Sequence, residues 1–186
     1  MESLENNYTI TGGIKLETLV PERVLIIPNR DHIKTWADFG IKVTNQTSTP
    51  YRFIFFNLDI ELVELEGESI RSEKGNTNRM NIPQESDFLL AQPGETLTFL
   101  TKIKYVWRGY SLGLSYQNLS NQTYSFIGLK PTKYWVRFTY RNSYTTRKLH
   151  GSRTPWPFSE ELWTGIASSP YEEFYLEYPP PLDFRG

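Results

Sequence analysis

Apolar and polar residues alternate along most of this chain, with the period of a β-strand and not of a helix. The clearest run is WADFGIKVT at residues 36–44, where Phe39, Ile41 and Val43 lie two residues apart. The full set of expected strands is 8–16, 23–27, 36–44, 51–65, 88–90, 96–104, 112–116, 123–127, 133–141, 162–168 and 171–178. About ten short strands separated by glycine, proline and asparagine are typical of a β-sandwich.

Two stretches break this regularity. Within residues 51–65 the apolar series shifts by one position at Leu62–Val63, which predicts one long or bent strand with a β-bulge near that point. Residues 73–87 show little periodicity and are expected to form a long loop. A loop of that length either carries a function or is the crossing connection of a Greek key, and we favour the second interpretation.

Composition agrees with an all-β chain of one domain. The chain has 186 residues, 15% of them aromatic, and alanine occurs only at Ala37, Ala91 and Ala167. Aromatic and β-branched side chains fit pleated sheets, and scarce alanine disfavours helices. We expect one sandwich domain over residues 1–178 and a proline-rich tail over 179–186.

The chain contains no cysteine, which excludes disulfides, thiolate metal sites and cysteine nucleophiles. The N-terminal residues lack the pattern of a signal peptide, and no apolar run reaches the roughly 20 residues of a membrane helix. The expectation is therefore a soluble, cytoplasmic protein with no membrane partner.

The segment GLKPTKYWVRFTY at residues 128–140 joins a turn to a strand. Leu129, Pro131 and Tyr134 have the spacing of a tyrosine corner, in which the tyrosine hydroxyl bonds to the backbone a few residues upstream. The segment resembles the corner and following strand of immunoglobulin-like and fibronectin type III domains. SSPYEEFYL at residues 168–176 resembles their last strand, and the wider pattern over residues 36–178 is similar to bacterial immunoglobulin-like domains.

This resemblance implies a single antiparallel β-sandwich of the immunoglobulin-like kind, with extra N-terminal strands and a long loop near residues 141–161. It implies no functional residue, because this sandwich hosts many unrelated roles.

Charge is distributed unevenly along the chain. Residues 101–150 contain lysine and arginine but no aspartate or glutamate, although the net charge of the whole chain is −1. One interpretation is a basic aromatic surface for a polyanion. The favoured interpretation is pairing between neighbouring strands, with Lys133, Arg137 and Arg141 opposite carboxylates of residues 171–178. Nucleic acid is not an expected partner, since its binding domains are usually basic.

Aromatic residues mark a candidate ligand or partner surface. Its members are Trp135, Arg137, Trp156, Phe158 and Trp163. Exposed aromatic rings in the segment around Trp156 and Trp163 suit a protein or carbohydrate partner. Alternatively, the PWPF sequence folds back and closes one end of the sandwich.

Catalytic chemistry finds little support in the sequence. His32 and His150 are the only histidines, and no G-x-S-x-G elbow accompanies them. Asp59 and Glu61 lie two apart on an expected strand and so share one face, where they are interpreted as solvated residues. We expect no catalytic residue, cofactor or metal. The predicted function is a non-catalytic protein-interaction or scaffold module. The alternative is a carbohydrate- or polyanion-binding module using residues 101–150 and the Trp156/Trp163 segment, and a hydrolase comes third.

Overall fold

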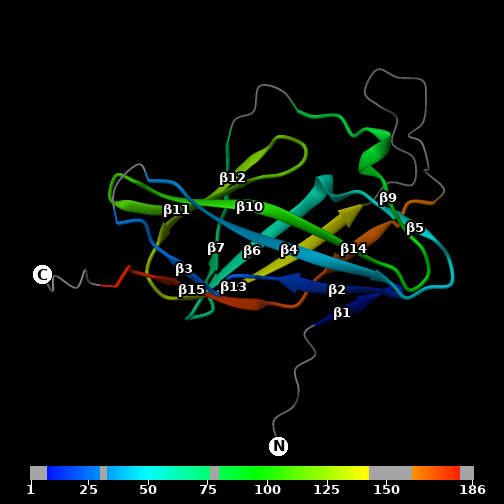
Figure 1. The fold of residues 1–186 in the computed structure, drawn as a ribbon, viewed down its shortest axis with the longest axis horizontal. Helices are drawn as coiled ribbons and strands as arrows, with labels where there is room; N and C mark the ends of the chain where they lie inside the picture. The colour runs from blue at the N-terminus through cyan, green and yellow to red at the C-terminus, as the bar shows by residue number, and fades with distance from the viewer. Residues whose placement is uncertain (1–7, 30–32, 76–79, 143–160, 181–186) are drawn as a thin grey trace, which may run out of the picture.

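Two β-sheets packed face to face form the fold in the computed structural model, which describes residues 8–29, 33–75, 80–142 and 161–180 (Figure 1). The large sheet has the order β1 (Thr9–Thr11), β2 (Ile14–Leu19), β4 (Thr35–Asn45), β10 (Thr96–Arg108), β11 (Ser111–Gln117), β12 (Thr123–Leu129), β8 (Glu73–Lys74). The small sheet has the order β3 (Val24–Ile26), β15 (Glu172–Glu177), β13 (Lys133–Asn142), β6 (Leu58–Glu64), β7 (Ser69–Ile70), and β14 (Gly165–Ser168) also pairs with β13.

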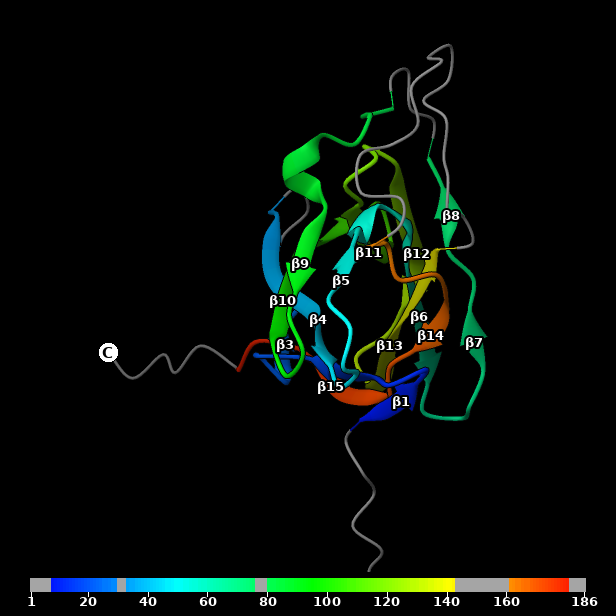
Figure 2. The same cartoon turned by 90° about the vertical axis from the view of Figure 1, so that its right-hand side faces the viewer.

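A two-stranded ribbon lies at one end of the sandwich. It pairs β5 (Tyr51–Phe53) with β9 (Leu89–Ala91) (Figures 1 and 2). Short 3-10 turns, η1 (Phe55–Asn57) and η2 (Glu85–Asp87), accompany it. Every strand pair named above is antiparallel except β3 with β15, which is parallel. The expected all-β sandwich is confirmed, and no helix in the described ranges is long and apolar enough to cross a membrane.

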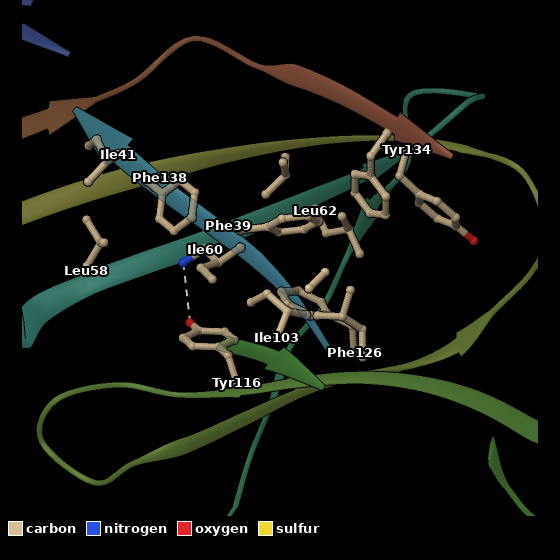
Figure 3. Packing of buried hydrophobic residues seen from close by; sticks show 14 of the residues in the cluster. Phe39, Ile41, Leu58, Ile60, Leu62, Ile103, Tyr116, Phe126, Tyr134 and Phe138 are labelled. Atoms are coloured by element: carbon tan, nitrogen blue, oxygen red, sulfur yellow. Dashed lines mark hydrogen bonds between the residues drawn. The ribbon is translucent and has the colours of Figure 1, made fainter. Parts of the chain in front are cut away.

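The core fills the space between the two sheets because alternate residues of each strand point inward. On β4, Phe39, Ile41 and Val43 are almost fully buried, as their spacing predicts. Phe39 meets Phe174 of β15 edge to face, with ring centroids 5.0 Å apart, so the large and small sheets are in direct contact. Figure 3 shows a second link, in which the Tyr116 hydroxyl accepts a hydrogen bond of 3.3 Å from the Ile60 backbone N–H.

The tyrosine corner is present as predicted. The Tyr134 hydroxyl donates to the Lys130 carbonyl oxygen at 3.0 Å and accepts from the Lys130 backbone N–H at 2.9 Å. Tyr134 and Leu129 are both buried. The turn before β13 is therefore tied to the core by one side chain.

The prediction for residues 51–65 is wrong in its geometry. The segment is divided into β5, η1 and β6, and β6 pairs with β13 from Leu58 to Glu64 without a register shift. The break falls at residues 54–57, where the chain leaves the β5–β9 ribbon and enters the small sheet. Leu62 is buried and Val63 lies half-exposed on the outer face, so consecutive residues alternate normally here. The apparent shift arises because an apolar residue, Val63, occupies an outward position.

A β-bulge interrupts the last strand of the sandwich. Thr139 pairs with Ser168, but Val136 pairs with Glu172, so residues 169–171 oppose only Arg137 and Phe138. The Ser169 hydroxyl accepts a hydrogen bond of 3.0 Å from the Phe138 backbone N–H. Ser169 thus replaces a ladder bond, and the bulge separates β14 from β15.

The expected loops are only partly described. Within residues 73–87 the structure has β8 and η2, and the rest of the described residues there are irregular. Most of the loop expected near 141–161 lies outside the described residues. The division into a domain at 1–178 and a tail at 179–186 remains a prediction.

Candidate functional site

The outer face of the small sheet brings together two of the candidate residues, Trp135 and Arg137. Tyr134, Val136 and Phe138 of β13 point into the core. The intervening side chains therefore point outward, and Trp135 and Arg137 are half-buried there. We call this the small-sheet face. Its outward residues on β13 are Lys133, Trp135, Arg137, Thr139 and Arg141.

Arg137 and Glu61 form the centre of the small-sheet face. The Arg137 Nε and Nη2 atoms donate to one Glu61 carboxylate oxygen at 2.8 and 2.6 Å. The Thr139 hydroxyl donates to the other oxygen at 3.0 Å, and the Tyr171 hydroxyl lies 3.4 Å from the first. The Arg137 guanidinium also lies over the Tyr171 ring, 4.6 Å from its centroid. This arginine is held on several sides and its orientation is fixed.

The pKa values of the two carboxyl groups on β6, Asp59 and Glu61, shift in opposite directions. Burial acts to raise the pKa of Glu61, but hydrogen bonds from Arg137 and Thr139, with the Arg137 charge, outweigh it and leave the pKa below its ordinary value. Burial raises the pKa of Asp59, only partly opposed by the Arg141 charge. Asp59 has the weaker partner, since its oxygen is 3.9 Å from the Arg141 Nε.

The partners expected for the three cations of β13 are right for one and wrong for two. Lys133 forms an ion pair of 2.5 Å with Glu173 of β15, as predicted. Arg137 and Arg141 instead face Glu61 and Asp59 of β6, on the other side of β13. The bulge at residues 169–171 is the reason, because β15 ends its pairing with β13 at Val136.

A shallow hollow of about 400 Å³ lies on the small-sheet face. It is lined by Trp135 and Tyr171, with Val63 and Gly67 from β6 and the turn after it. Tyr171 is a residue that sequence reasoning missed. Its sequence signal is the serine-proline pair before it, which places Tyr171 at the end of the bulge.

Trp163 is removed from the candidate surface by its burial. Only 7% of its surface is exposed. Its ring stacks on Phe53 with centroids 6.1 Å apart and lies 5.5 Å from the Tyr140 ring. It closes the core beneath the β5–β9 ribbon. Trp156 and Phe158 lie outside the described residues, as do His32 and His150.

A second aromatic hollow, of about 670 Å³, lies at the opposite end of β10 from the β5–β9 ribbon. Gly109, with φ of +62°, turns the β10–β11 hairpin and leaves Tyr110 fully exposed. Trp107 lines the hollow and is anchored, since its Nε1 donates to the Pro28 carbonyl oxygen at 2.7 Å. Tyr178, beyond β15, lines the other side. We call this the Trp107 hollow.

The described residues include no group of three or more histidine, cysteine, aspartate or glutamate side chains placed to hold a metal ion. Comparison of the chain with protein-family models, curated proteins and solved structures gives no match.

Proposed function

We propose that this chain is a protein-interaction module of the immunoglobulin-like class, and that it binds its partner through the small-sheet face. The observation that carries the proposal is the Trp135–Tyr171 hollow beside a set of charges already paired with one another.

Strand order supports the immunoglobulin-like class. In that sandwich strands A, B and E are neighbours in one sheet, and strands C, F and G are neighbours in the other. Here β2, β4 and β10 are neighbours in the large sheet and correspond to strands A, B and E. In the small sheet β6, β13 and β15 are neighbours and correspond to strands C, F and G. The corner tyrosine, Tyr134, lies at the start of β13, where strand F begins in that class.

The chemistry of the small-sheet face suits a protein partner. Tryptophan, tyrosine and arginine are the residues most enriched at the energetic centres of protein interfaces. Trp135, Tyr171 and Arg137 are adjacent here, and the arginine and tyrosine are held by Glu61 before any partner arrives. Fewer side chains then lose freedom on binding, which favours affinity.

Charge also argues for a protein over a polyanion on this face. Lys133 and Arg137 are closely paired with carboxylates, and Arg141 lies 3.9 Å from Asp59. A polyanion would have to compete with Glu61 and Glu173 for these cations.

The test compares the full chain with its Trp135→Ala and Tyr171→Ala variants. Partners captured from host lysate by the wild type are purified and titrated by calorimetry. We expect each variant to weaken binding by at least about tenfold, the usual effect of removing a central interface residue. Ile10→Ala, which truncates a 54% exposed apolar side chain on β1 of the large sheet, is the control. Equal binding by wild type and Trp135→Ala, or equal loss in Ile10→Ala, contradicts the proposal.

Carbohydrate binding at the Trp107 hollow is the second candidate function. Exposed Tyr110 and Tyr178 with anchored Trp107 offer flat rings around a space of sugar size, about 670 Å³. A glycan array read with wild type and Tyr110→Ala tests it. Retained glycan signal in Tyr110→Ala, or none in the wild type, rules this site out, and Trp135→Ala serves as the control on the other face.

A further inference from the structure

One edge of β10 is only half paired. Along one side β10 pairs with β4 from Thr96 to Tyr105. Along the other side it pairs with β11 only from Ile103 to Arg108. The edge from Thr96 to Lys102 therefore has no neighbouring strand among the residues that the structure describes (Figure 1). We call it the open edge.

The direction of the backbone groups on the open edge follows from the ladder. The Asn45 N–H donates to the Glu95 carbonyl, so odd-numbered residues of β10 bond to β4. Even-numbered residues direct their N–H and C=O groups away from β4, as Arg108 does where it closes the β10–β11 hairpin with Ser111. Thr98 and Leu100 thus present backbone donors and acceptors at the open edge, and so does the N–H of Lys102. The Lys102 carbonyl instead belongs to the end of the β10–β11 ladder, which begins at the pair Ile103–Tyr116.

The two sides of the open edge differ in the space that they offer. On the outer surface a hollow of about 510 Å³ is lined by Leu100, Trp36 and Leu119, among others. On the inner side there is only a void of about 10 Å³, lined by Phe55 and Phe99, whose rings stack with centroids 5.0 Å apart. Phe99, Thr101 and Tyr116 line both spaces, so the edge runs between them. A strand added at this edge has room for its outward side chains in the outer hollow, and its inward side chains would cover the half-exposed Leu97 and Phe99.

Charge at the open edge is positive. Lys102 and Lys104 line the outer hollow, and no carboxylate lines it. The Lys102 ammonium is paired with Asp38 at 2.9 Å, whereas Lys104 has no ion pair with any residue in the described ranges. Leu100, 48% exposed, adds apolar surface beside them.

We propose that the open edge accepts an extended segment of a partner polypeptide as an added strand, in which acidic and apolar residues alternate. The free backbone groups of Thr98 and Leu100, together with the N–H of Lys102, supply the ladder. The period of two places the acidic side chains beside Lys102 and Lys104 on the outside and the apolar ones toward Phe55 and Phe99. The segment is short, because the β11–β12 turn at residues 118–122 blocks its continuation.

This site is separate from the small-sheet face, because the open edge belongs to the other sheet. The two proposals can therefore fail independently. Trp135→Ala is expected to leave strand addition unchanged, and a substitution at the open edge is expected to leave the small-sheet partner bound.

The probe is the capped peptide EVEVEVE, titrated into the isotope-labelled full chain and followed by amide shifts and hydrogen exchange. We expect the Thr98, Leu100 and Lys102 amides to gain at least about tenfold protection at saturation, since added ladder bonds cover them. KVKVKVK should bind at least about tenfold more weakly, because it meets Lys102 and Lys104 with like charge.

Two further reagents test the backbone directly. Thr98→Pro removes an N–H that faces the open edge while keeping the bonds to β4, and we expect it to reduce EVEVEVE binding at least about tenfold. EVEVEVE N-methylated at alternate residues tests the same ladder if Thr98→Pro does not fold. One of the two methylation frames should lose binding and the other should keep it.

Several outcomes overturn the proposal. They are absent binding of EVEVEVE, binding that neither methylation frame alters, and protection that maps to Val24 and Ile26 on the β3 edge. A last outcome also overturns the proposal of a separate partner. If protection of Thr98 and Leu100 rises with protein concentration in the absence of peptide, and sedimentation shows a dimer, the open edge binds a second copy of the chain.

Discussion

The outer faces of the two sheets carry similar side chains and organise them differently. On the small sheet, Arg137 lies beside Trp135 on β13 and is bound to Glu61 by two hydrogen bonds. On the large sheet, Lys104 lies opposite the exposed Trp36, with no ion pair in the described residues. Strand neighbours account for the contrast. β13 pairs with β6 from Tyr134 to Tyr140 and, on its other side, with β15 and β14 except at the bulge, whereas β10 pairs on both sides only from Ile103 to Tyr105.

The two proposed binding faces differ in what they would offer to a partner. Where ladders are complete, a face offers side chains already fixed by their neighbours, and binding costs little ordering. Where a ladder stops, the backbone itself is available, and recognition comes from strand pairing and charge. The four predictions below test whether the two faces differ as the contacts indicate.

The largest effect is expected at Gly40 of β4, which lies close to the backbone of β10 at Phe99. A Cβ added at Gly40 would lie 2.1 Å from the Phe99 carbonyl oxygen, and the neighbouring Leu100 side chain covers the same space. Gly40→Ala should lower the free energy of unfolding by about 1–3 kcal/mol, because the backbone of β10 must move. Urea denaturation measures it. Gly113→Ala is the control, since its Cβ would meet nothing closer than 3.5 Å. Equal losses in both variants mean that β10 is not held tightly against β4.

The next prediction compares the ion pairs of the two faces. A double-mutant cycle on Arg137 and Glu61 should give a coupling of about 1–2 kcal/mol, because this partly buried pair has several hydrogen bonds. The same cycle on Lys102 and Asp38 should give less than about 0.5 kcal/mol, since Lys102 is 69% exposed. Equal couplings would remove the distinction drawn between the faces.

The corner tyrosine tests whether β13 depends on local anchoring. Tyr134→Phe removes the hydroxyl that serves both the N–H and the C=O of Lys130. The free energy of unfolding should fall by about 0.5–1.5 kcal/mol. It should fall further if no water replaces the hydroxyl as the hydrogen-bond partner of these backbone groups. Tyr110→Phe, which loses a fully exposed hydroxyl, should change nothing measurable. A Tyr134→Phe variant as stable as the wild type shows that the corner bonds contribute little.

The smallest effect is the acid response of the small-sheet face. The pKa of Glu61 is below its ordinary value of 4.5, so its contribution to stability is complete above that pH and is lost as pH falls through the folded-state pKa. Glu61→Gln should therefore make stability depend less steeply on pH below about 4.5. The raised pKa of Asp59 acts in the opposite direction, and Asp59→Asn should make the acid loss steeper. Urea midpoints from pH 7 to pH 3 separate the cases, and parallel curves would contradict both assignments.

Local features of the fold were predictable from residues close together in the chain. The buried residues of β4 follow from the alternation of apolar and polar residues, which is visible in the sequence. The corner depends on a hydrogen bond between Tyr134 and Lys130, only four residues apart, and its spacing is visible there too. The partners of Arg137 and Arg141 were not predictable. The sequence shows that these cations point outward from a central strand, but it does not show which neighbouring strand carries the carboxylate. Here β6 carries it, because the bulge ends the pairing of β13 with β15.

The candidate site shows the same division. The sequence identified Trp135 and Arg137 as possible surface residues, because alternation separates them from Tyr134 and Val136. It did not reveal Tyr171, whose position over Arg137 comes from the bulge at residues 169–171. It also placed Trp163 among surface residues, although packing against Phe53 and Tyr140 buries it.

By itself, then, the sequence determined an all-β chain, its main strands and its corner, since each rests on short-range periodicity or bonding. Only the tertiary structure decided which strands are neighbours, which aromatic rings are buried and where β10 loses its partner. Those features depend on contacts between residues far apart in the chain. The two proposed binding faces therefore become visible only when both sheets are assembled.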